Sequence, residues 1–238
     1  RPMFLRAVLY PALPFALFQY LTSKDMKDVW EFMQSIPAVA RRNDDNHMMF
    51  PSNIRLGLLG WNLVFMDTDP VDYSLPEELK DTVENVEKWQ KGKYWVAGLG
   101  HCSECHTPRN IAQALIPERI FQGNLIDGWN APDITANELY LGGWDEKTLT
   151  DFLHTGHSDK GTVFAGMADV VKNSLSLMTR DDVASMSYYL LNGDKNNFIG
   201  KNTKPLQPLG FDEKAYQEPI YITYQQTCGA CHGDDCNL

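Results

Sequence analysis

The chain has 238 residues and a formal net charge of −10 at pH 7, with 21 basic side chains against 31 acidic ones. This acidic balance argues against nucleic acid and anionic membrane surfaces as partners. The length allows one or two domains. The apolar residues 3–21 are interrupted by Arg6, Pro11 and Pro14 and therefore do not predict a membrane-spanning helix.

The first predicted helix follows a proline-rich segment, residues 1–22, which has no regular period. Thr22 and Asp25 have the spacing of a capping box, and Pro37 ends the pattern. The apolar positions at intervals of three and four are Met26, Val29, Trp30 and Met33. A loop followed by one helix is not a whole domain, so residues 1–37 are predicted to be the C-terminal part of one.

Residues 38–88 are predicted to be a connector between domains. It contains a charged and polar run and then a short apolar segment, residues 57–66. That segment is too short to cross a bilayer. We expect it to pack between domains or, as the next possibility, against a partner subunit.

A complete domain is predicted over residues 89–192, and it opens with Cys102-x-x-Cys105-His106. This pattern is the attachment signature of a c-type haem. The two thiols add across the two vinyl groups of one porphyrin, and the imidazole of the next residue becomes the proximal iron ligand.

The signature recurs as Cys228-x-x-Cys231-His232, which makes a chance match improbable. Residues 193–212 between the two domains are polar and rich in Asn, Lys and Pro, as expected of a linker. Residues 213–238 are predicted to be the start of another haem domain.

Two other uses of paired cysteines fit the pattern less well. A zinc ribbon places its CxxC knuckles about 15–20 residues apart, whereas Cys105 and Cys228 are separated by most of the chain. A thioredoxin-type dithiol has no need of a histidine in both copies. The remaining cysteine, Cys236, is interpreted as an unpaired thiol.

An aromatic ring precedes the first cysteine of each motif by seven positions, Trp95 in one copy and Tyr221 in the other. We expect these rings to pack on the terminal helix of their domain. Little regular structure is predicted over residues 122–132, which are rich in Gly and Pro.

Two helices are predicted after residue 132. One runs from its cap at Asp145 to His154 and ends at Gly156. The other follows the capping pair Thr179 and Asp182. Its apolar face consists of Val183, Met186, Tyr189 and Leu190.

The sixth iron ligand decides what such a haem can do, because a methionine sulfur raises the potential and favours electron transfer. Met167 is the candidate, in a predicted loop before the terminal helix. Met178 and Met186 lie in or beside helical stretches and are expected to be core residues. The alternative ligands His154 and His157 are expected to face solvent. No methionine follows Met186, so the haem on His232 has no distal methionine within this sequence.

Two further residues are predicted to contact the haem group. Pro108 is expected to orient His106 through its backbone carbonyl. Arg109 is a candidate partner for a haem propionate, with a solvated surface charge as the alternative.

Several stretches carry a family resemblance. They are YPALPF (10–15), FPSNIRLGLLGWNLVF (50–65), GLGHCSECHTPRN (98–110), GWNAPDIT (128–135), LGGWDEKTLTDFLHTG (141–156) and GMADVVKNS (166–174). In these the chain resembles the multihaem cytochrome c subunits of bacterial membrane-bound dehydrogenases, those of the alcohol, gluconate, fructose and aldehyde dehydrogenase complexes. The resemblance implies three haem domains in a row, with Met167 at the position of the second distal methionine.

Two departures from the family pattern stand out. Leu13 occupies the tract where the family places the methionine of its first haem, and leucine cannot bind iron. Asp235-Cys236 replaces the usual Asp-Gly-rich run after the third motif. The chain starts at Arg1 rather than at Met, and we expect a processed or partial chain, with a third CxxCH before Arg1 and a methionine-bearing domain after Leu238.

The sequence therefore predicts a mostly α protein of tandem small c-type cytochrome domains, the first and last incomplete. Its predicted function is transfer of single electrons from a flavin-, quinone- or molybdenum-dependent dehydrogenase subunit to a quinone or terminal oxidase. Haem c is attached outside the cytoplasm, so we expect a periplasmic location at the outer face of the inner membrane. The alternatives are a haem enzyme of the peroxidase or thiosulfate-oxidising type, and a cytochrome module of a molybdenum hydroxylase.

Overall fold

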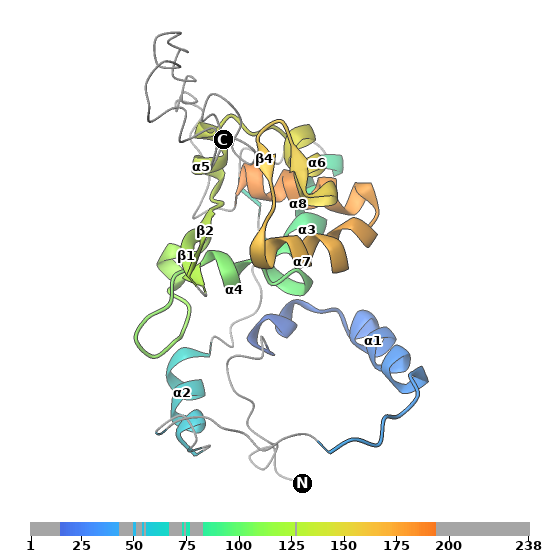
Figure 1. The fold of residues 1–238 in the computed structure, drawn as a ribbon, viewed down its shortest axis with the longest axis vertical. Coiled ribbons are helices and arrows are strands. Elements are labelled where there is room, and N and C mark those ends of the chain that lie inside the picture. Colours follow the sequence, from blue (N-terminus) through green and yellow to red (C-terminus); the bar gives the residue numbers. More distant parts are fainter. Residues whose placement is uncertain are drawn as a thin grey trace, which may run out of the picture.

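A computed structural model describes residues 15–42, 50, 54, 56–66, 73, 75–76, 83–126 and 128–193, and these residues are mostly helical (Figure 1). The α-helices are α1 (Ser23–Ser35), α2 (Gly57–Phe65), α3 (Val83–Lys93), α4 (Cys102–His106), α5 (Ala136–Leu141), α6 (Glu146–Thr155), α7 (Ala165–Asn173) and α8 (Arg180–Asn192). A π-helix, η4 (Tyr94–Leu99), continues α3, and the 3-10 turns are η2 (Phe15–Tyr20), η5 (Pro117–Arg119) and η6 (Leu175–Leu177). Within the described residues, antiparallel hairpins pair β1 (Gln122–Ile126) with β2 (Trp129–Asp133) and β3 (His157–Ser158) with β4 (Gly161–Thr162).

The centre of the fold is the packing of α3 against α8. Trp89 of α3 is 0% exposed, its ring meets the Tyr189 ring edge-on at 5.4 Å, and its indole N–H donates to the carbonyl of Gly193 at 2.7 Å. Gly92 permits the close crossing, because a Cβ there would overlap the carbonyl oxygen of Ser185. Trp95 in η4 is partly buried against the core, and η4 contacts α8, as the sequence predicted for this ring. Tyr221 lies outside the described residues.

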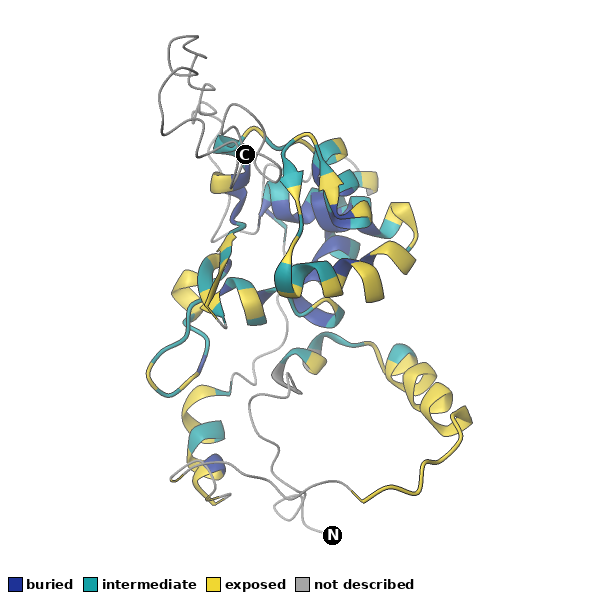
Figure 2. Cartoon of the chain, in the orientation of Figure 1, coloured by how far each residue is buried: buried dark blue, intermediate teal, exposed yellow. Residues whose placement is uncertain are grey.

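Buried residues of η4, α5, α6, α7 and η6 pack around this pair, and Figure 2 colours much of α3 and α8 as buried. The buried residues of the core are Trp89, Val96, Phe121, Leu139, Leu149, Leu153, Val171, Leu175, Val183, Met186, Tyr189 and Leu190. All four residues of the predicted apolar face of α8 are among them, and Thr179 caps this helix by accepting from the Asp182 amide at 3.2 Å. The α6 prediction is also confirmed, since Asp145 caps the helix and Gly156 ends it in the left-handed conformation.

Sequence reasoning was wrong about residues 122–132, which form most of the β1–β2 hairpin rather than an irregular loop. The register pairs Gln122 with Asp133 and Ile126 with Trp129. Neither strand alternates apolar and polar residues, because the ribbon has no buried sheet face, and Pro132 within β2 argued against a strand.

The predicted N-terminal helix is confirmed as α1. Thr22 accepts from the Asp25 amide at 3.1 Å, and the helix ends before Pro37. Its predicted apolar face is uncovered in the described structure, with Trp30 60% exposed (Figure 2). The segment before α1 instead packs on η4, where the rings of Phe18 and His101 lie 5.8 Å apart.

The apolar segment within the predicted connector forms α2. Its Trp61 indole N–H donates to the carbonyl of Ala112 at 2.8 Å, so the helix rests on the loop that follows the CxxCH motif. The predicted packing of this segment between domains stays a prediction. Leu63 and Val64 of the same helix are exposed. Among the described helices, none combines the length and apolar content that a bilayer crossing requires.

Candidate haem-attachment site

Both cysteines and the histidine of the first CxxCH motif lie on the short helix α4. The chain turns into α4 through Gly100 and His101, and His101 adopts the left-handed conformation with φ 52° and ψ 27°. A Cβ at Gly100 would lie 2.7 Å from the carbonyl oxygen of Trp95 and 3.4 Å from Sγ of Cys102. Because Gly100 has no side chain, the end of η4 can lie directly against Cys102.

The two thiols differ in exposure, but neither is activated. Burial of its sulfur raises the pKa of the Cys102 thiol to about 12. The pKa of the more exposed Cys105 is also raised, first by partial burial and then by the neighbouring Glu104 carboxylate. A redox-active dithiol depends on a lowered thiol pKa. The raised pKa values of both thiols therefore do not favour dithiol chemistry. In the part of the chain that is described, no three His, Cys, Asp or Glu side chains gather as a metal cluster.

His106 has the geometry of a metal-binding imidazole. Its Nδ1 lies 2.8 Å from the carbonyl oxygen of Pro132 in β2. A carbonyl only accepts, so Nδ1 carries the proton and Nε2 keeps its lone pair. Burial lowers the pKa of His106, although the hydrogen bond to Pro132 and the nearby Asp133 act in the opposite direction. A neutral imidazole fixed through Nδ1 is the form that binds iron through Nε2, so the residues present fit a c-type haem.

This finding corrects the role predicted for Pro108. The carbonyl that orients His106 belongs to Pro132, while the carbonyl of Pro108 accepts the Ile116 amide at 3.0 Å. The sequence offered no signal for Pro132, because it lies 26 residues from His106 and reaches it only through the hairpin.

Thr107 holds the hairpin under His106. Its side chain is 0% exposed, and its hydroxyl accepts from the Phe121 amide at 3.0 Å. The carbonyl of Phe121 in turn accepts from the Ile134 amide at 2.9 Å, so both ends of the hairpin are tied to the residue after His106. A lone threonine after CxxCH gave no indication of this contact from sequence alone.

Thr107→Val should therefore destabilise the fold. Valine has nearly the same shape but cannot accept, so the buried Phe121 N–H loses its partner at a cost of about 1–3 kcal/mol. Chemical denaturation of the wild-type and variant chains measures the difference. Thr155→Val, at an exposed threonine on α6, is the control and should change the stability much less. Equal stability of the Thr107 variant and the wild type would contradict the role given to this hydroxyl.

Arg109 makes contacts within the protein. Its guanidinium forms an ion pair with Glu104, which lies between the two cysteines, and it donates to the Gln113 carbonyl at 2.7 Å. These bonds connect α4 to the loop that supports α2. A guanidinium has five N–H donors, and these contacts do not use all of them. The contact between Arg109 and a haem propionate therefore remains a prediction.

The three candidate methionines lie in different surroundings. Met186 is 2% exposed inside α8, as expected of a core residue. Met167 is partly buried against the core, in the first turn of α7 rather than in the predicted loop. Met178 is also partly buried, and its carbonyl lies 3.2 Å from Nε2 of His154, which is thus engaged within the protein. His157 is exposed, as predicted.

The second motif consists of Cys228, Cys231 and His232, and it lies outside the described residues. Leu13 and Cys236 lie outside them as well.

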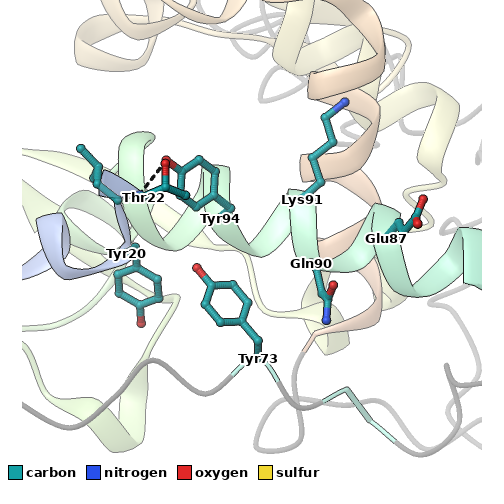
Figure 3. A pocket seen from close by; sticks show the side chains of 8 residues that line it. Tyr20, Thr22, Tyr73, Glu87, Gln90, Lys91 and Tyr94 are labelled. Carbon is teal, nitrogen blue, oxygen red and sulfur yellow. Dashed lines mark hydrogen bonds between the residues drawn. The ribbon is translucent and has the colours of Figure 1, made fainter. Parts of the chain in front are cut away.

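A separate pocket lies between the segment before α1 and the helix α3, with Tyr94 of η4 at its edge (Figure 3). It is lined by Tyr20, Leu21, Thr22, Tyr73, Glu87, Gln90, Lys91 and Tyr94. The hydroxyl of Tyr94 at its edge donates to the Asp25 carboxylate. This pocket is open, and its lining contains no residue of the CxxCH motif, so we assign it no part in haem binding.

The domain is mostly helical, and one short helix carries both cysteines and the histidine of CxxCH. The imidazole of this histidine is neutral and hydrogen-bonded. Together these features define the class of c-type cytochromes. Comparison with known proteins leads to the same class. No protein-family model matches the chain. The gluconate 2-dehydrogenase cytochrome c subunit of Pantoea cypripedii is 33% identical over an alignment of 242 residues. The alignment covers 95% of this chain and 53% of that relative.

Two further relatives have related descriptions. The cytochrome c subunit of alcohol dehydrogenase (quinone) from Gluconobacter oxydans is 30% identical over 246 residues, covering 96% of this chain and 49% of the relative. A nicotinate dehydrogenase subunit of Pseudomonas putida is 33% identical over 183 residues, covering 76% of this chain and 15% of the relative. The chain is homologous to cytochrome c subunits of gluconate, alcohol and fructose dehydrogenases. It spans about half the length of the gluconate and alcohol dehydrogenase subunits.

Proposed function

We propose that this chain transfers single electrons through covalently attached c-type haems and performs no substrate chemistry of its own. The observation that supports this most directly is the state of His106, whose Nδ1–H is committed to Pro132 at 2.8 Å while Nε2 stays available. When bound, haem c supplies an iron that exchanges one electron at a time.

The residues that would hold this group can be assigned roles. Cys102 and Cys105 would hold the porphyrin through thioether bonds, each S–H having added across one vinyl group. His106 would bind the iron through Nε2, and Met167 would provide a thioether sulfur as a second ligand. Arg109 is the candidate contact for a haem propionate. It would use the guanidinium N–H groups that do not already bond to Glu104 and Gln113.

The second CxxCH motif is proposed to hold another haem through Cys228, Cys231 and His232. A third haem is expected upstream in the full subunit, in keeping with the three-haem pattern of the family. Leu13 lies where that family places a distal methionine, so we propose that the first haem of this protein has a different sixth ligand.

The proposed partner is the catalytic subunit of a dehydrogenase, because several relatives are cytochrome c subunits of such enzymes. The proposed acceptor is a quinone or a terminal oxidase, and the proposed location is the periplasm, at the outer face of the inner membrane. The similarity to a nicotinate dehydrogenase subunit supports a second candidate, a partner enzyme that oxidises nicotinate.

Reduction of the haems by a partner's substrate tests this function. The native complex should be isolated, and its flavin, quinone or molybdenum content determined. Gluconate, ethanol, fructose and nicotinate are then added separately while the haem absorption is recorded. Reduction by one of them supports the proposal and identifies the type of partner. If all four substrates fail while a chemical reductant reduces the haems, the proposed partner classes are wrong.

Met167→Ala should abolish the weak sulfur-to-iron charge-transfer absorption of the haem at the first motif. The reduction potential of that haem should also fall, because the thioether ligand is lost. Optical spectra and a potentiometric titration of the full chain measure both effects. Met178→Ala is the matched control, since Met178 is another partly buried methionine. Loss of the band in the Met178 variant alone would transfer the ligand assignment to Met178.

A further inference from the structure

Two aromatic rings meet at the surface of the domain without being buried there. Trp129 is the first residue of β2, and Phe164 immediately precedes α7. Their ring centroids are 5.4 Å apart at an interplanar angle of 60°, yet the two residues remain 56% and 48% exposed. An edge-on contact of this kind is favourable beyond the area it buries, so it joins the two segments.

Each ring belongs to a segment that carries one side of the proposed haem site. Trp129 lies three residues before Pro132, whose carbonyl fixes Nδ1 of His106. Phe164 lies three residues before Met167, the proposed distal ligand. The contact therefore connects the strand that orients the proximal ligand with the helix start that carries the distal one.

Besides the ring contact, Val163 and Met167 hold the start of α7, since both are partly buried against the core and the Val163 amide donates to the Gly156 carbonyl at 2.9 Å. No side-chain hydrogen bond caps the helix, and its one buried residue is Val171, more than a turn beyond Met167. Ala165 has φ 49°, which an alanine adopts at some cost in energy. A Cβ at Gly166 would meet no atom within 4 Å. Because this helix start is strained and has no capping side chain, the contact between the two rings adds to its stability.

We propose that Trp129 and Phe164 form an aromatic clasp that positions Met167 on the distal side of the haem. The clasp rests on the proposed function, because it concerns the same methionine. Both residues act through the backbone of α7 and β2 and are positioning residues rather than ligands. Without the clasp, the first turn of α7 can move away, and the sixth coordination position becomes accessible to other ligands.

The test compares Trp129→Ala and Phe164→Ala with the wild type in the full haem-loaded chain. The measured quantities are the intensity of the sulfur-to-iron band and the rate at which the ferrous protein binds carbon monoxide. We expect the band to weaken and the population with dissociated Met167 to rise about two- to tenfold, the range that the loss of one aromatic pair implies. Carbon monoxide binding should accelerate by the same factor, and Trp129→Phe, which keeps a ring at this position, should restore both quantities.

Controls separate the possible outcomes. Phe32→Ala removes a ring that is 67% exposed on α1 and should change neither quantity. If the wild type has no covalent haem, or if Met167→Ala leaves the band intact, the proposed ligation itself is wrong. If the ligation holds but Trp129→Ala behaves as the wild type does, the clasp is wrong. Should the alanine variants fail to fold, Trp129→Leu and Phe164→Leu decide, since they keep apolar bulk but lose the edge-on ring contact.

Discussion

Replacing both Cys102 and Cys105 with serine will remove one covalently attached haem per chain. Serine hydroxyls do not form the thioether bonds, so the denatured variant should lose the haem of this motif while it keeps the one predicted at Cys228 and Cys231. Haem content per chain, measured after denaturation, should fall by one equivalent. The tryptic peptide that spans the motif should then have its unmodified mass.

A matched control keeps the thiols and changes their neighbour. Glu104→Gln removes the ion pair with Arg109 but leaves both cysteines and His106 in place, so its haem content should equal that of the wild type. Free thiols at Cys102 and Cys105 in the wild-type chain, or an unchanged haem content in the double serine variant, would refute the proposed attachment.

The second large effect is expected for Trp89→Ala, with a loss of about 3–5 kcal/mol in the free energy of unfolding. Trp89 is 0% exposed and lies where α3 crosses α8. Its removal leaves a cavity beside Tyr189, and it also deprives the Gly193 carbonyl of the indole donor at 2.7 Å. Chemical or thermal denaturation, followed by far-ultraviolet circular dichroism, measures the loss.

Trp30→Ala is the control for this substitution, because Trp30 is 60% exposed on α1 and has little packing to lose. Trp89→Phe should be intermediate, since it keeps most of the ring contact but lacks the N–H donor. A small effect at Trp89 together with a large one at Trp30 would mean that the helix pair is not the centre of stability.

The sequence predicted the helices whose ends carry local signals. The caps at Thr22, Asp145 and Thr179 act on amides within the same turn, so the interaction that starts the helix is present in the sequence itself. The apolar face of α8 was predictable for a similar reason, because it repeats at helical spacing and is buried along its length.

The missed features depend on contacts between distant residues. The hairpin has no alternating pattern, since its faces are not buried, and it is fixed instead by Thr107 and Phe121. Pro132 acts on His106 through a backbone carbonyl, which no residue type encodes. The helix α7 begins without a capping side chain, so Met167 was expected in a loop. The CxxCH residues themselves were predictable, because the chemistry of attachment dictates their order.

The bond from Trp89 to Gly193 also bears on how such a chain can be assembled. It joins the first helix of the domain to the residue that follows its last helix. The described chain therefore leaves α8 beside α3, the helix through which it enters this domain. A unit whose two ends lie close together can be duplicated or inserted without disturbing its interior, which would suit the tandem haem domains proposed for this chain.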